Sequence, residues 1–118
     1  MKYLLQIYPD AATAEFARLS AQEQEAIVGE YNAIRQAPGV IGGDQLQPVE
    51  TATTVRVQDG ETLLTDGPFV ETKEQLAGYF LINAKDLNEA VRIAARVPGA
   101  RIGTIEARLV KEIAGLPT

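Results

Sequence analysis

The stretch Thr65–Ile82 reads TDGPFVETKEQLAGYFLI. Its Asp-Gly-Pro start is typical of a turn, because Gly67 has unusual backbone freedom and Pro68 fixes its own φ. A charged run from Glu71 to Glu74 comes next, and the apolar segment from Ala77 to Asn83 then has the composition of a central strand. An ordinary turn does not need so many charged residues before a strand. The stretch therefore predicts a strand that follows a loop at the rim of a cleft.

Upstream of this loop the sequence predicts an extended segment and a hairpin. Val40 to Val49 has strand composition, and its Gly42-Gly43 pair indicates a bulge or a close approach of another backbone. Thr53 to Gln58 alternates in the manner of a half-buried strand. Asp59-Gly60 is a strong hairpin signal, so Glu61 to Thr65 is expected to pair with the strand before it.

A first helix is predicted after a strand at Tyr3–Tyr8. Ser20 and Glu23 have the spacing of a capping box, which marks the start of the helix. Pro38-Gly39 is its expected end. The apolar stripe expected on this helix consists of Ile27, Tyr31 and Ile34.

A second helix is predicted after the central strand. Asp86 and Glu89 have the same capping-box spacing, and Pro98-Gly99 is the expected end. A last strand is expected from Ile102 to Val110. The expected buried stripe of the second helix consists of Leu87, Val91 and Ala94.

The order strand, helix, strand, hairpin, strand, helix, strand predicts an α+β fold, a ferredoxin-like sandwich with an inserted β-hairpin. It is expected as a single domain over residues 1–118. The helices cover one sheet face, and the opposite face is too apolar to be left in water. We expect that face to join a homodimer that buries on the order of 1,200 Å² or more. The residues expected there are Leu4, Tyr8, Arg56, Glu106, Arg108 and either Tyr79 with Leu81 or Phe80 with Ile82.

Composition excludes several function classes. The chain has 118 residues, a net charge of −5 and neither cysteine nor histidine. Thiol chemistry and the commonest general base and metal ligand are therefore absent. Scattered bases in an acidic chain argue against nucleic-acid binding, and no cofactor, metal or dinucleotide motif is expected. Short apolar runs argue against a membrane segment, so a soluble cytoplasmic protein is expected.

Several short motifs, taken together, resemble those of one known family. They are Ala52–Arg56, Asp59-Gly60, Thr65–Phe69, Glu71–Leu76, Gly78–Phe80 and Asp86–Ala90. With them the chain resembles the DGPF branch of the YCII-related family over nearly its whole length. The resemblance implies a dimeric α+β barrel. Some relatives are dehydrochlorinases or lactone-type enzymes for which a His–Asp pair has been proposed. Asp66 matches the aspartate of that pair, but the chain has no histidine to match its partner.

Asp66 and Tyr31 are the candidate catalytic residues, and each has a structural alternative. Asp66 is either an acid/base or polar ligand-binding group in the cleft, or a turn residue whose carboxylate, or the neighbouring Thr65, accepts from backbone amides. Tyr31 is either catalytic or a core residue whose hydroxyl needs a partner. Pro68 biases Gly67 away from the α region, so Gly67 is expected to have an unusual backbone conformation.

The candidate ligand-binding residues are Arg56, Glu71, Thr72, Lys73 and Glu74. The charged cluster is either a binding site or a solvated loop, and Arg56 either holds an anion or pairs with Glu106 across the dimer. Two functions remain. The first is a small dimeric ligand-binding or regulatory module. The second is a lyase or isomerase acting on a small cyclic carboxylic acid. Convergence of Asp66, Tyr31 and Arg56 on one pocket would favour the enzyme.

Overall fold

The computed structural model describes residues 1–9, 18–70 and 74–116, without the side chain of residue 102. Six strands and three α-helices are assigned in these ranges, with one short 3₁₀ helix. In chain order they are β1 (Lys2–Pro9), α2 (Ala21–Arg35), β2 (Val40–Gln45), the 3₁₀ helix η1 (Val49–Thr51), β3 (Thr53–Gln58), β4 (Glu61–Asp66), β5 (Gly78–Asn83), α3 (Leu87–Arg96), α4 (Gly99–Ile102) and β6 (Gly103–Leu109).

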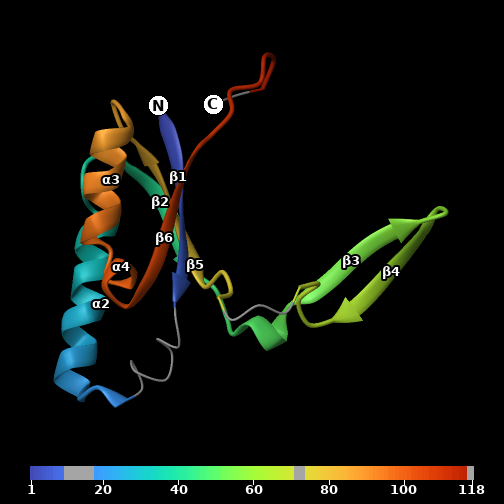
Figure 1. Ribbon diagram of the computed structural model, residues 1–118, viewed down its shortest axis with the longest axis horizontal. Coiled ribbons are helices and arrows are strands. Elements are labelled where there is room, and N and C mark those ends of the chain that lie inside the picture. Colours follow the sequence, from blue (N-terminus) through green and yellow to red (C-terminus); the bar gives the residue numbers. More distant parts are fainter. Residues whose placement is uncertain (10–17, 71–73, 117–118) are drawn as a thin grey trace.

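The main sheet has four strands in the order β2-β5-β1-β6, and every neighbouring pair is antiparallel. The helices lie together on one face of this sheet, and the β3–β4 hairpin stands apart from it (Figure 1). Without the hairpin, the order is β-α-β-β-α-β, the split βαβ arrangement. The predicted α+β fold with an inserted hairpin is therefore confirmed.

The core lies between the sheet and the helices. Alternate residues of β1 and β5 point toward the helices, because side chains in a strand change face at every residue. The buried residues are Tyr3, Leu5, Ile7, Ile34, Phe80, Ile82, Ala84, Ala90, Ala94 and Val97.

The start of α2 follows the predicted capping box. The hydroxyl of Ser20 accepts from the backbone N–H of Glu23 at 3.1 Å, and the Glu23 carboxylate accepts from the backbone N–H of Ser20 at 3.3 Å. Ile34 is buried, and Ile27 and Tyr31 are half-buried on the same stripe. These contacts fix both where the helix begins and which side faces the sheet.

The buried stripe predicted for α3 is wrong at two of its three positions. Leu87 and Val91 are 54% and 51% exposed, while Ala90 and Ala94 are buried. The alanines face the sheet because their small side chains let the helix approach closely. Both stripes are apolar at helical spacing, so the periodicity does not separate them.

Both ends of α3 also differ in detail from the prediction. The Asp86 carboxylate caps Glu89 as expected, at 2.9 Å, but the Glu89 carboxylate accepts from the N–H of Lys85 rather than of Asp86. The helix ends at Arg96, and Pro98-Gly99 opens α4 instead of ending α3. Proline is well suited to the start of a helix, because the N–H that it lacks would be unpaired there.

Strand β2 is shorter than predicted, since it ends at Gln45 and Val49–Thr51 is a 3₁₀ turn. The glycine pair has the two roles proposed for it. The register shifts between Val40 and Gly42. A Cβ on Gly43 would lie 2.5 Å from the carbonyl oxygen of Tyr79 and 2.6 Å from Cδ1 of Phe80. Glycine is thus required at position 43, where β2 pairs with Phe80 of β5.

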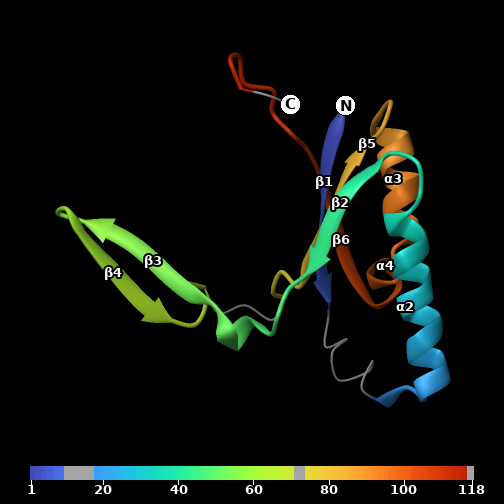
Figure 2. The ribbon, with the colours of Figure 1, turned by 180° about the vertical axis from the view of Figure 1, so that it is seen from behind.

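The hairpin of residues 53–66, here called the arm, is paired as predicted, but it is not half-buried. Asp59 and Gly60 both have positive φ, as the tight hairpin turn requires. Nearly every arm residue is exposed. The arm projects from the end of the sheet at which β1 ends, on the side away from the helices (Figures 1 and 2). The radius of gyration is accordingly 16.5 Å, against about 13.5 Å for a compact chain of this length.

Candidate functional site

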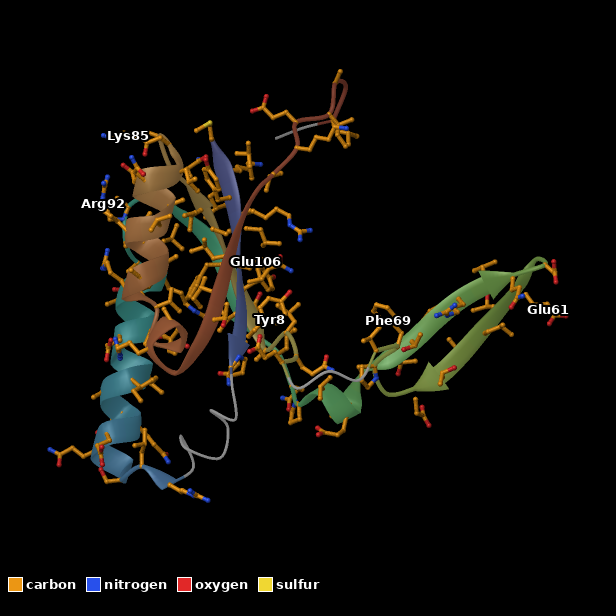
Figure 3. The ribbon with its side chains drawn as sticks, viewed as in Figure 1. Tyr8, Glu61, Phe69, Lys85, Arg92 and Glu106 are labelled. Carbon is orange, nitrogen blue, oxygen red and sulfur yellow. The ribbon has the colours of Figure 1, made fainter. Side chains whose placement is uncertain are left out.

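The sheet face opposite the helices, here called the open face, is a mixed polar and apolar surface. Strand alternation places Tyr79 and Leu81 on it, rather than Phe80 and Ile82, which are buried against the helices. Figure 3 shows Tyr8 and Glu106 on this side of the sheet. The open face consists of Leu4, Gln6, Tyr8, Gly42, Asp44, Tyr79, Leu81, Thr104, Glu106 and Arg108. Most of those on β1 and β5 are half-buried in the single chain.

Four polar side chains cross the open face in one line, one from each strand. Asp44 lies opposite Tyr79, Tyr79 lies opposite Gln6, and Gln6 lies opposite Glu106. We call these four residues the polar row. The next line across the sheet holds Leu81 and Leu4 instead, ending at Arg108. The polar row is therefore a narrow band that borders apolar side chains.

Tyr79 and Asp44 are joined directly. The Tyr79 hydroxyl donates to Oδ2 of Asp44 at 3.1 Å. This hydrogen bond, and secondly the negative charge of the carboxylate, raise the pKa of Tyr79 above its usual value of 10.0, because both disfavour the phenolate. Tyr79 thus stays a neutral hydroxyl and orients the Asp44 carboxylate.

Gln6 lies at the centre of the polar row with hydrogen-bonding capacity unused. Its amide oxygen is shielded from solvent, and no hydrogen-bond donor from the described part of the chain reaches it. A shielded acceptor without a partner costs about 1–3 kcal/mol, so such groups concentrate where structure serves function. At the edge of the row, Glu106 and Arg108 form a loose ion pair at 3.8 Å.

Arg56 and Asp66 lie on the arm rather than on the main sheet, so the placement of Arg56 on the open face is wrong. Asp66 pairs with Thr53, three residues before Arg56. Three positions along a strand correspond to about 10 Å and an opposite direction of the side chain. Arg56 and Asp66 therefore point to opposite sides of the arm, and the chain does not bring them together.

Tyr31 belongs to the helix side of the sheet. Its ring stacks on Phe80 with a centroid distance of 6.3 Å, and its hydroxyl lies beside Gly99. Burial raises the pKa of Tyr31 above 10.0, and the Gly99 backbone and the Arg101 charge oppose that rise. These contacts fit the core role. The sheet lies between Tyr31 and the arm that carries Arg56 and Asp66.

The turn at Gly67 is held by residues other than Asp66 and Thr65. Gly67 has φ of +91°, so its predicted unusual conformation is confirmed. Its N–H donates to the carbonyl of Ala52 at 2.7 Å, and the Thr54 hydroxyl donates to its carbonyl at 2.8 Å. Asp66 and Thr65 make neither bond, so the expectation that one of them supports the turn is not met there.

The charged loop is described only in part. Glu71, Thr72 and Lys73 lie outside the described residues, and Glu74 is exposed at the loop's end. The sequence predicts binding roles for these four residues and a Lys73 side chain that faces Asp66, Glu71 or Glu74, and both stay predictions.

A separate hollow of about 310 Å³ lies near the two ends of the chain. It contains neither a predicted site residue nor a member of the polar row. Its lining residues are Met1, Lys2, Asn83, Val110, Lys111, Glu112, Ile113 and Leu116.

Within the described ranges, no helix is long and apolar enough to cross a membrane.

Sequence reasoning missed Gln6 and Asp44, although it left Tyr79 open as a surface candidate. The alternation of β1 carries a weak signal for Gln6, the single polar residue between Tyr3 and Tyr8. Asp44 carries no such signal, because its meeting with Tyr79 depends on pairing between strands 35 residues apart.

Comparison with known proteins agrees with the fold. The pattern of the YCII-related domain matches residues 1–114. An uncharacterized protein of Rhizobium meliloti (strain 1021) is 34% identical over 108 residues, which cover 88% of this chain and 86% of that protein. The matched region contains both the polar row and the arm. The chain therefore belongs to the YCII-related domain family.

Proposed function

We propose that this protein is a homodimeric small-molecule-binding module whose binding surface is the open face of the sheet. The observation that carries the proposal is the polar row, with the side chains of Asp44, Tyr79, Gln6 and Glu106 aligned across four strands. The row also retains an unsatisfied acceptor at its centre.

The chemistry of the row defines the class of ligand. Asp44 and Glu106 supply carboxylate oxygens, and Gln6 supplies an amide oxygen, so acceptors outnumber donors. The Tyr79 hydroxyl already donates to Asp44. The matching ligand is a small molecule with several hydrogen-bond donors, such as amine or hydroxyl groups, and an apolar part for Leu4 and Leu81.

A second chain completes the proposed site. The middle of the open face, on β1 and β5, is half-buried and partly apolar in the single chain, and two such faces stacked about 10 Å apart would form a dimeric α+β barrel. The polar row of each chain then lies between the two sheets. A site enclosed in this way excludes water and strengthens hydrogen bonds to the ligand.

The enzyme alternative lacks comparable support. Acid/base chemistry on a cyclic carboxylic acid would need Asp66 and Tyr31 beside the substrate, with Arg56 as the carboxylate anchor. One chain holds these residues at three separate places. The binding module needs no such convergence.

A thermal-shift screen of metabolites tests the binding module. A ligand that binds the native state raises its stability, by about 2.7 kcal/mol at a concentration of one hundred times Kd. The expected hits carry amine or hydroxyl donors. The variants Asp44→Ala and Gln6→Leu should lose the shift, and Glu25→Gln, an exposed charge change on α2, should keep it.

Two results would overturn the proposal. One is a hit whose shift survives both polar-row variants, which would move the site elsewhere. The other is a monomer in sedimentation equilibrium at micromolar concentrations, since the enclosed site needs two sheets.

A further inference from the structure

The arm exposes more apolar surface than a hairpin in water tolerates. Val55 and Leu64 lie directly opposite each other, and Val57 lies two positions along on the same face. Their exposed fractions are 58%, 68% and 71%. Phe69, at the root of the arm in Figure 3, is 76% exposed. Isolated two-stranded hairpins are marginal in water, so this surface requires a partner.

The chain also exposes more surface than a compact monomer of its mass. The accessible surface is 8,625 Å² for a chain of 12.7 kDa. A compact monomer of this mass exposes about 6,200 Å², so the excess is roughly 2,400 Å². Obligate homodimers bury about 1,000–2,500 Å² on each chain, which matches the excess.

The position of the arm relates it to the open face. Both views place the arm on the side of the sheet that faces away from the helices (Figures 1 and 2). A partner subunit that packs on the open face would therefore lie beside the arm. The six residues of each arm strand span about 20 Å, twice the spacing of two stacked sheets, so the arm can pass a partner's sheet and reach its helix layer.

From these observations we infer that the arm clasps a second copy of this chain, with the face formed by Val55, Val57 and Leu64 lying against the partner subunit. This inference rests on the homodimer of the proposed function and adds the part of the chain that closes it. A two-fold dimer repeats the contact, because each chain gives one arm and receives one. The arms then border the two polar rows and limit access to the site between the sheets.

Two adjacent residues give a matched test. Val57 and Gln58 are neighbours on β3 that point to opposite sides of the arm, and both are exposed. Val57→Asp and Gln58→Asp add the same charge at nearly the same place. In sedimentation equilibrium, Val57→Asp should raise the dimer Kd at least about tenfold, and Gln58→Asp should change it less than about twofold. Circular dichroism checks that both variants fold.

A second measurement locates the arm directly. Because the chain has no cysteine, Val57→Cys and Gln58→Cys each carry a single polarity-sensitive fluorophore. The label at position 57 should shift to the blue as concentration passes through the dimer Kd, and the label at 58 should shift much less.

The outcomes separate this inference from the proposed function. A wild-type dimer whose Kd is unchanged in Val57→Asp, with no spectral shift at position 57, overturns the clasp while the two-sheet dimer stands. A wild-type chain that stays monomeric overturns both.

Discussion

The hydroxyl of Tyr79 donates to Oδ2 of Asp44 at 3.1 Å, across the pairing of β5 with β2. This contact holds a carboxylate at one end of the polar row. The hydrogen bond needs the protonated phenol, so it contributes stability below pH 10.0, the usual pKa of tyrosine. The contribution disappears as the pH rises through the higher pKa of the folded state.

Removing the carboxylate should therefore lower the pKa of Tyr79. Asp44→Ala should return that pKa to about 10.0, and Asp44→Asn should return it only in part, because an amide still accepts a hydrogen bond. Carbon-13 NMR of the labelled tyrosine ring measures the titration, with Tyr79→Phe to assign the signal. Equal pKa values in all three proteins would mean that the contact is not made in solution.

Gly43 is expected to tolerate no side chain. Gly43→Ala puts a Cβ against the Tyr79 carbonyl and the Phe80 ring, so it should lower the free energy of unfolding by about 1–3 kcal/mol. Gly29→Ala is the matched control, since no atom lies within 4 Å of its Cβ in the middle of α2. It should raise stability by about 0.5–1 kcal/mol. Urea denaturation measures both, and equal effects would contradict the close approach.

Tyr31 should matter to stability rather than to binding. Tyr31→Phe keeps the ring on Phe80 and removes only the hydroxyl beside Gly99, so it should cost no more than about 1 kcal/mol. Tyr31→Ala also removes the ring, and should cost about 2–4 kcal/mol. Urea denaturation gives these values. A Tyr31→Phe variant with full stability and no ligand binding would instead place Tyr31 in the site.

The parts of the fold carried by local signals could be predicted from the sequence. Ser20 and Glu23 interact within one helical turn, and Asp59-Gly60 encodes its own turn, so both were recognised. The faces of β5 could not be assigned, because Tyr79 and Phe80 are both apolar enough for either side. Pairing with β1 decides the question, and that register is not a local property.

The same limit explains the error on α3 and leads to a test. Val91 is 51% exposed and Ala90 is fully buried. Val91→Ala should change the free energy of unfolding by less than about 0.5 kcal/mol. Ala90→Val adds two methyl groups against the sheet and should cost about 1–3 kcal/mol. Thermal and urea denaturation compare the pair, and the reverse order would restore the stripe predicted from Leu87 and Val91.

The turn at Gly67-Pro68 directs the side chain of Phe69 into solvent. Gly67 is fixed by Ala52 and Thr54, and Pro68 is rigid, so the chain presents Phe69 with 76% of its surface in solvent. Such a residue adds little to the fold of its own chain, and aromatic residues dominate the energetics of interfaces. Phe69→Ala should therefore leave the unfolding of the monomer within about 0.5 kcal/mol of wild type at high dilution. At micromolar concentration it should weaken the proposed dimer about tenfold. Sedimentation equilibrium and dilution-dependent denaturation separate these effects, with Gln58→Ala, on the face of the arm opposite Val57, as the control. A loss of stability that is the same at every concentration would instead place Phe69 in the core of its own chain.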